Sequence, residues 1–131
     1  MEIKMSEKKA LETDKAAILG GPYSQAIIHN GIIYLSGQGP IDPQTNQVVH
    51  GTIEQETEIS LENIRIILEE AGASLNMVLQ VRVYLFDMKE YSRFNEVYTR
   101  YFQTDPPART CIQAGKLPFG TRVEIDAIAY I

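Results

Sequence analysis

Asn30-Gly31 separates two runs of β-prone residues and predicts a tight turn between two strands. Both central residues of a type I′ turn need a positive φ, which Asn and Gly adopt more readily than other residues. The sequence therefore predicts a β-hairpin whose strands occupy about residues 24–29 and 32–37. Glycines, prolines and turn-forming residues between 37 and 46 then end the second strand and send the chain into a loop.

The hydrophobic period changes after this loop. Apolar or small residues recur at steps of three and four from Ile53 to Ala71, which is typical of an amphipathic helix. Thr52 and Gln55 match a capping box at its start, and Gly72 suits the left-handed residue that ends many helices. A helix is therefore expected between Thr52 and Gly72.

Four further elements complete the expected fold. Alternation predicts a strand over about 78–86, an aromatic stripe predicts a helix over about 88–102, and two strands follow at about 109–114 and 122–131. We interpret the aromatic stripe as core, because aromatic residues at helical spacing are usually buried. The order is ββαβαββ, and two amphipathic helices can cover one face of such a sheet. The expected fold class is therefore α+β.

The composition limits the classes of protein to which the chain can belong. Its 131 residues suit one domain, expected over 16–131 and preceded by a charged, flexible tail over 1–15. No apolar run approaches the roughly 20 residues of a membrane helix. With 12 Lys and Arg against 17 Asp and Glu, the net charge of −5 disfavours nucleic acid as a partner. One cysteine and two histidines give neither an intrachain disulfide nor a usual zinc site, so we expect a cytoplasmic protein.

Alternation in the last two strands predicts which side chains share a face of the sheet. The aliphatic residues of the final strand are expected under the helices, together with Thr110 and Ile112 of the strand before it. The opposite face would then combine charged and apolar groups, namely Arg109, Cys111, Glu124, Asp126, Ile128 and Tyr130. Burial against another subunit explains such a mixed surface better than full solvation does, so we expect an oligomer.

Arg109 and Glu124 are the candidate catalytic residues of that face. Prolines just before Arg109 restrict its backbone, and a guanidinium fixed there can bind a substrate carboxylate through two parallel hydrogen bonds. Glu124, expected on the neighbouring strand, can orient or deprotonate a water molecule. The alternative is an ion pair between the two strands, with a structural role only. No motif places a histidine to activate Cys111, so a packed thiol is favoured over a nucleophile.

Two segments near the C-terminus carry a family resemblance: Pro-Ala-Arg-Thr-Cys-Ile-Gln-Ala-Gly-Lys-Leu at 107–117 and Val-Glu-Ile-Asp-Ala-Ile-Ala at 123–129. Together they resemble the signature of the reactive-intermediate deaminase family, also called the YjgF or Rid family. Further matches follow in the order of the family at 21–26, 35–38, 61–64, 71–72 and 94–98. The resemblance covers the chain from about residue 21 to its end.

The resemblance implies a homotrimer of chorismate-mutase-like subunits, whose sheets form a central barrel and whose active sites lie in clefts between neighbours. The archetypal branch of the family hydrolyses 2-imino acids, such as 2-iminobutanoate and 2-iminopropanoate, to 2-keto acids and ammonia without metal or cofactor. Arg109 would bind the substrate carboxylate, and Glu124 would hold the attacking water. The other implied site residues are Gly37 and Cys111, through their backbone, with Tyr23, Ser36, Phe94 and Asn95 around the cleft or at the interface.

One departure and two other functions accompany this interpretation. Gln55-Glu56 reverses the expected order of the acidic residue and the glutamine, on what we interpret as a helix face without effect on the chemistry.

A non-catalytic regulator that binds small carboxylates could use the same cleft. An endoribonuclease or translation inhibitor is the third class, and the acidic charge without a basic, aromatic stripe speaks against it.

Overall fold

The structure, a computed structural model, describes residues 7–131 and consists of a six-stranded mixed sheet with two helices. The elements are β1 (Lys9–Leu11), β2 (Ala26–His29), β3 (Ile32–Gln38), α1 (Ile53–Glu70), β4 (Val78–Leu85), α2 (Tyr91–Tyr101), β5 (Ala108–Gln113) and β6 (Val123–Tyr130), with short 3-10 helices at Leu75–Met77, Met88–Glu90 and Pro118–Gly120.

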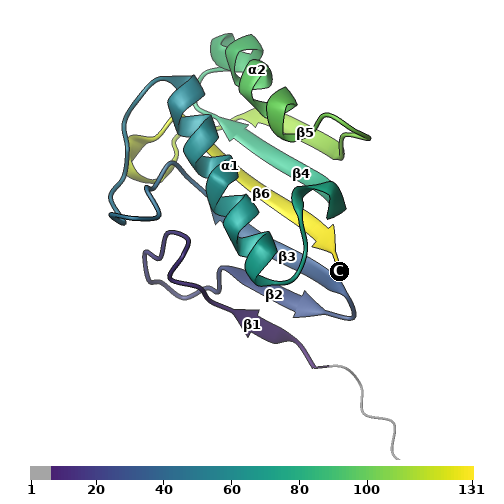
Figure 1. The fold of residues 1–131 in the computed structure, drawn as a ribbon. Helices are drawn as coiled ribbons and strands as arrows, with labels where there is room; N and C mark the ends of the chain where they lie inside the picture. The colour runs from purple at the N-terminus through teal and green to yellow at the C-terminus, as the bar shows by residue number, and fades with distance from the viewer. Residues whose placement is uncertain (1–6) are drawn as a thin grey trace, which may run out of the picture.

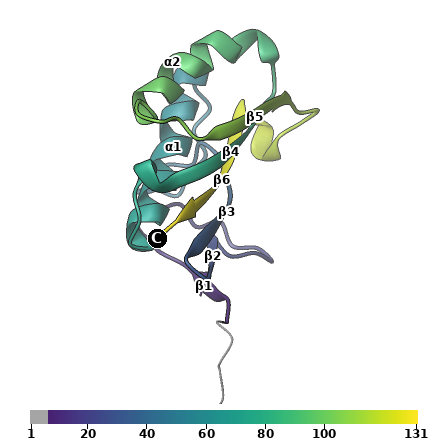
Figure 2. The same cartoon turned by 90° about the vertical axis from the view of Figure 1, so that its right-hand side faces the viewer.

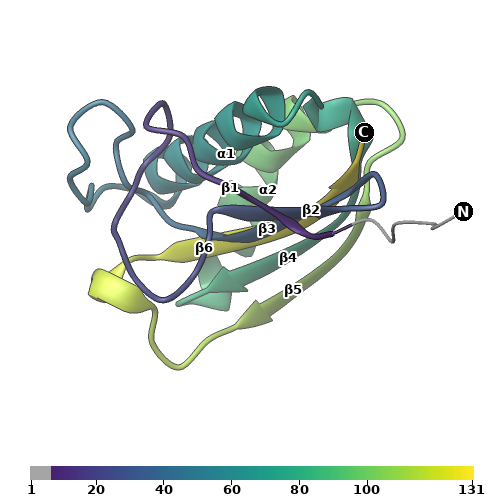
Figure 3. The same cartoon turned by 90° about the horizontal axis from the view of Figure 1, so that it is seen from below.

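The strands lie in the order β1-β2-β3-β6-β4-β5 (Figure 1). Neighbouring strands are antiparallel except β4 and β5, which run parallel. Both α-helices cover the same face of the sheet, as Figures 2 and 3 show from two directions. We call the opposite face, over which neither α1 nor α2 lies, the helix-free face. The predicted α+β class and the placement of both helices on one face are confirmed.

The predicted hairpin is present. Asn30 and Gly31 have φ values of 50° and 77°, and β2 pairs with β3 in the register that a two-residue turn requires, with His29 opposite Ile32. The second strand continues to Gln38, past a bulge between Leu35 and Gln38 that interrupts its pairing with β6.

The predicted ends of the first helix are also confirmed. The hydroxyl of Thr52 accepts a hydrogen bond from the backbone N–H of Gln55, and the side chain of Gln55 accepts one from the N–H of Thr52. Gly72 follows the helix with φ of 87°. The second helix is shorter than predicted, because residues 88–90 form a 3-10 helix before α2.

The N-terminal segment differs from the expected flexible tail. Lys9–Leu11 form strand β1 on the edge of the sheet, and Thr13 is buried. The side-chain amide of Gln25 explains this order: its Oε1 accepts from the N–H of Thr13 at 2.6 Å, and its Nε2 donates to the carbonyls of Thr13 and Ala17. Residues 1–6 of the expected tail lie outside the described residues.

Glu56 lies on a helix, as the sequence predicted, but its carboxylate is buried. It is 1% exposed, and its two carboxylate oxygens accept the backbone N–H groups of Gly51 and Arg122 at 3.1 and 2.7 Å. The guanidinium of Arg122 lies near the same carboxylate at 3.8 Å. Glu56 thus connects the first turn of α1 to the segment that leads into β6.

The core lies between the two helices and the sheet. The alternate residues of β6 that the sequence assigned to the helix side are buried, and they pack with aliphatic residues of α1 and β4 and with Phe94 of α2. Within residues 7–131, neither α1 nor α2 has the length and apolar character needed to span a bilayer.

Candidate active site

The structure places Arg109 and Glu124 on opposite faces of the sheet. Arg109 lies beside Val81 in the parallel register of β4 and β5, and Val81 is buried under the helices. Glu124 lies opposite Tyr84 of β4, whose side chain alternates with that of Val81 and points to the other face. The prediction that Arg109 and Cys111 share a face with Glu124 and Asp126 is therefore wrong.

The position of β5 in the sheet explains this error. β5 is an edge strand, so its aliphatic residues need not face the core, and Ile112 is 49% exposed on the helix-free face. Arg109 faces α2 instead, where polar and aromatic side chains receive its guanidinium. The alternative of an ion pair between neighbouring strands is also wrong, because β4 separates β5 from β6.

The first half of the candidate site is the Arg109 cluster, formed by Arg109, Tyr91, Phe94, Asn95 and Tyr98. The guanidinium Nη1 donates to the Oδ1 of Asn95 and Nη2 donates to the hydroxyl of Tyr91, both at 2.8 Å. Its Cζ lies 4.6 Å from the ring centroid of Tyr98 and 5.7 Å from that of Phe94.

The charge of Arg109 has neutral surroundings. Within residues 7–131 its guanidinium forms no ion pair with a carboxylate, whereas Arg65, Arg82, Arg93 and Arg122 each pair with Glu or Asp. Its side chain is half-buried, so a ligand can reach it while water screens it less than at an open surface. Such a cation is suited to bind an anion.

Burial changes the acidity of two neighbours of Arg109. Desolvation raises the pKa of the Tyr98 phenol to about 12, an effect that the positive charge of Arg109 partly offsets. Desolvation also raises the pKa of the Cys111 thiol, again against the effect of Arg109. A thiol that holds its proton more tightly is a poor nucleophile, which supports a packing role for the Cys111 side chain.

The second half of the candidate site is the Glu124 cavity, on the helix-free face. Its volume is about 350 Å³. Four of its residues were expected at the site from the sequence, and Leu35, Arg82 and Asp126 complete the lining: Tyr23, Leu35, Ser36, Gly37, Arg82, Glu124 and Asp126.

Glu124 is half-buried in this cavity. Desolvation raises the pKa of its carboxyl group, and the negative charge of Asp126 raises it further. Asp126 accepts a hydrogen bond from the Nε of Arg82 at 2.9 Å and one from the hydroxyl of Tyr84 at 3.3 Å. A carboxylate whose pKa is raised toward neutral pH is a better general base than an ordinary surface glutamate.

Gly37 makes room for this carboxylate. A Cβ atom at Gly37 would lie 2.6 Å from the Oε2 of Glu124, so no other residue fits there without moving the carboxylate. Ser36 is held by its neighbours: its hydroxyl donates to the carbonyl of Ser24 at 2.5 Å, and its N–H donates to the carbonyl of Gln25.

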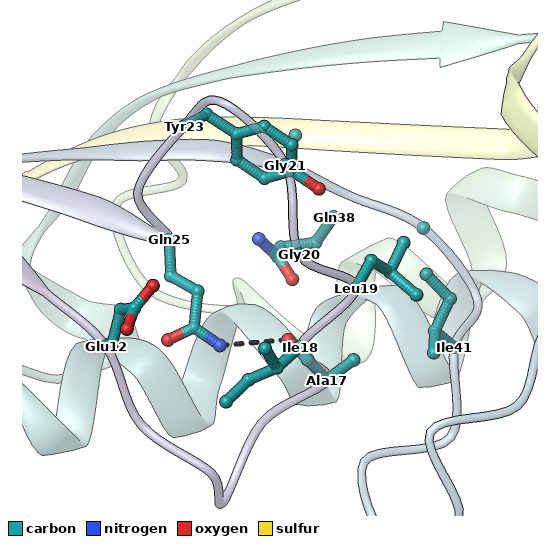
Figure 4. A pocket seen from close by; sticks show the side chains of 12 residues that line it. Glu12, Ala17, Ile18, Leu19, Gly20, Gly21, Tyr23, Gln25, Gln38 and Ile41 are labelled. Carbon is teal, nitrogen blue, oxygen red and sulfur yellow. Dashed lines mark hydrogen bonds between the residues drawn. The ribbon is translucent and has the colours of Figure 1, made fainter.

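Tyr23 joins the Glu124 cavity to a smaller one of about 50 Å³ (Figure 4). Tyr23 is 54% exposed, and its ring lies against Gly21, where a Cβ atom would be 2.7 Å from the ring. Leu19 and Ile41 lie together on one side of the smaller cavity, and Gln25 lies on the other with its hydrogen bond to Ala17.

The remaining expected residues divide between core and cluster. Phe94 is fully buried and touches the site only through its contact with Arg109, whereas Asn95 binds the guanidinium directly. Sequence reasoning missed Tyr91, which it placed in a core stripe; its spacing of four residues from Asn95 on one helix was the available signal. Among residues 7–131, no three His, Cys, Asp or Glu side chains gather as a metal site would require.

Comparisons with known proteins agree on one family. The family model described as Endoribonuclease L-PSP matches residues 14–131. A RutC family protein of Pyrococcus abyssi is 47% identical over 123 residues, covering 94% of this chain and 97% of that protein. A protein of Mus musculus named 2-iminobutanoate/2-iminopropanoate deaminase is 43% identical over 122 residues, covering 93% and 90%.

The fold leads to the same family. The crystal structure of YyfA from Yersinia pestis, a protein of the conserved Rid protein family, matches with a TM-score of 0.92 and 38% identity over 95% of this chain and 100% of that one. In sequence and in fold, the chain therefore belongs to the reactive-intermediate deaminase (Rid) family, whose model is described as Endoribonuclease L-PSP.

Proposed function

We propose that this protein is a 2-iminobutanoate/2-iminopropanoate deaminase, which hydrolyses reactive imines to 2-keto acids and ammonia in the cytoplasm without a cofactor. The observation that carries the proposal is the half-buried guanidinium of Arg109, held by Asn95 and Tyr91 and free of any ion pair to the carboxylates of residues 7–131. A 2-imino acid carries the carboxylate that such a group binds. The name of the mouse relative supports the same reaction.

The active site is proposed to form between copies of the chain. Arg109 and Glu124 lie on opposite faces of one sheet, so a substrate that touches both needs them from two subunits. The helix-free face also exposes large hydrophobic side chains: Tyr34, Ile112 and Tyr130 are each more than 40% exposed. Exposure of such side chains to water is unfavourable, and contact with another subunit would remove it. A homotrimer whose sheets line a central barrel would bury this face.

The proposed reaction needs little from the protein beyond positioning. Arg109 binds the carboxylate, and the backbone at Gly37 and Cys111 contacts the ligand. Glu124 orients a water molecule and accepts its proton as the water oxygen bonds to the imine carbon. Glu124 then returns the proton to nitrogen, which gives the carbinolamine. Next it transfers the hydroxyl proton of the carbinolamine to the amine nitrogen as the carbon–nitrogen bond breaks, so that the carbonyl of the 2-keto acid forms and ammonia leaves. Tyr23 and Ser36 line the cleft, and no covalent nucleophile takes part.

The test couples the protein to a threonine dehydratase and follows 2-ketobutanoate formation from the released imine. Wild type should accelerate the reaction, and Arg109→Ala should lower kcat/KM by more than about 100-fold, because it removes the charged partner of the substrate carboxylate. Arg100→Ala is the control, since Arg100 is an exposed arginine of α2, the helix whose Asn95 and Tyr91 hold Arg109.

The outcomes separate the three functions. No acceleration by wild type contradicts the deaminase. Binding of 2-ketobutanoate without turnover supports the carboxylate-binding regulator instead. Ribonuclease activity that copurifies with the protein and survives Arg109→Ala supports the endoribonuclease.

A further inference from the structure

The hydroxyl of Tyr91 contacts the guanidinium of Arg109 but takes no part in the chemical steps of the proposed reaction. Tyr91 begins α2, and Asn95 follows one turn later on the same side of the helix. Each accepts a hydrogen bond from a different terminal nitrogen of Arg109, at the same distance of 2.8 Å. Tyr91 is half-buried, as Arg109 is.

These two bonds define the orientation of the guanidinium. A planar group held through both Nη atoms cannot turn about its Cζ–Nε bond, and the ring of Tyr98 at 4.6 Å supports it from the side. Of the five N–H donors of an arginine, two are used here, and three remain for a ligand. With only Asn95 in place, one Nη would lose its partner and the plane could rotate.

We propose that Tyr91 is a positioning residue for the carboxylate site: its hydroxyl fixes the plane of the Arg109 guanidinium so that the remaining N–H donors face the bound anion. This inference rests on the proposed function, because it assigns to Arg109 the role of carboxylate binder. Preorganised donors bind an anion without first losing side-chain freedom, which is the expected gain.

Tyr91→Phe tests the proposal, because it removes the hydroxyl and keeps the ring. Tyr101→Phe is the matched control: it removes a hydroxyl of the same helix that donates to Glu62 at 2.9 Å, away from Arg109. The measurements are the Kd of 2-ketobutanoate by calorimetry, and KM and kcat in the coupled assay. Tyr91→Phe should raise Kd and KM about tenfold and leave kcat within about twofold, as expected for a contact that affects substrate and transition state equally. Tyr101→Phe should change none of them by more than about twofold.

A second measurement reads the guanidinium itself. In nitrogen-15 NMR spectra, restricted rotation about the Cζ–Nε bond of Arg109 gives separate signals for its two Nη atoms, and Tyr91→Phe should merge them. A packing role for the tyrosine ring would leave these signals separate. The Arg109→Ala spectrum assigns them.

The results distinguish this inference from the proposed function. If wild type binds 2-ketobutanoate but turns over no imine, the deaminase fails, and the Kd of Tyr91→Phe still decides the role of Tyr91. If Tyr91→Phe binds 2-ketobutanoate as wild type does, or if wild type does not bind it, the positioning role is overturned. If Tyr91→Phe weakens binding but keeps the two Nη signals apart, the hydroxyl does not act through the orientation of Arg109, and the proposal is likewise overturned.

Discussion

At the scale of single residues, the Glu124 cavity depends on the glycine at position 37, which has no side chain. Gly37 has no Cβ, and the Oε2 of Glu124 occupies the space that a Cβ would take, since the two would be 2.6 Å apart. The position of the proposed base is therefore set by the residue that faces it on β3, and any larger residue there must move the carboxylate.

Gly37→Ala should therefore impair the proposed reaction without unfolding the protein. Displacing a reacting group by about 1 Å can reduce a rate about 100-fold, so we expect kcat to fall by about that factor. KM should stay within about threefold, because Arg109 is unchanged. Steady-state kinetics in the coupled assay measure both values. Gly39→Ala is the control, since a Cβ there meets no atom within 4 Å, and equal kinetics for the two variants would contradict the steric argument.

The residues of the site differ in how far the sequence alone could identify them. Arg109, Glu124 and Gly37 stand in recognisable motifs, so their candidacy needed no structure. Tyr91 carries no such mark, because its role depends on a residue 18 positions away that only the fold brings to α2. The sequence likewise could not show that Asp126 and Arg82 form a pair in the lining of the cavity, since they are 44 residues apart.

At the scale of elements, local signals predicted the helices and the hairpin, and long-range pairing was not predicted. The caps of α1 and the turn at Asn30-Gly31 are interactions between near neighbours, which a sequence displays directly. Strand β1 pairs with β2, and the backbone of Thr13 just after β1 is held by Gln25, which lies 12 residues away in the sequence. Which side chains of β5 face the helices depends on its position at the edge of the sheet. The alternation of residues in the sequence does not show that position.

Glu56 gives a prediction at this scale, because it joins α1 to the segment before β6. Glu56→Ala removes two hydrogen bonds to a buried carboxylate, from Gly51 and Arg122, and should lower the free energy of unfolding by about 3 kcal/mol. Denaturant unfolding at one fixed protein concentration measures the change. Glu58→Ala, an exposed glutamate of the same helix, should cost less than about 0.5 kcal/mol. A loss below about 1 kcal/mol for Glu56→Ala would show that this connection contributes little.

At the scale of the whole molecule, the opposite placement of Arg109 and Glu124 predicts complementation between inactive variants. Arg109→Ala and Glu124→Gln should each be inactive alone. In a cyclic trimer that contains both variants, one of the three sites between neighbours receives an intact Arg109 and an intact Glu124, so about a third of the wild-type activity should return. Coexpression of the two variants with different tags, followed by double affinity purification and the coupled assay, measures the recovery.

The control for this experiment uses two variants of the same half-site. Glu124→Gln mixed with Gly37→Ala should regain nothing beyond the residual activity of Gly37→Ala, because both changes lie in the Glu124 cavity. Mixed oligomers of Arg109→Ala and Glu124→Gln that stay inactive would instead indicate that each chain holds its own complete site.

The division of the candidate site between two faces of one sheet has an evolutionary consequence. After duplication of such a gene, one copy can lose its arginine and the other its glutamate without loss of the reaction, provided that the two products assemble together. Each gene product would then be inactive alone, and selection would retain it for the catalytic residue that it supplies to the shared site. A sheet that displays one half of a site on each face therefore offers a short route from a homo-oligomer to an obligate hetero-oligomer, with two substitutions and no change of fold.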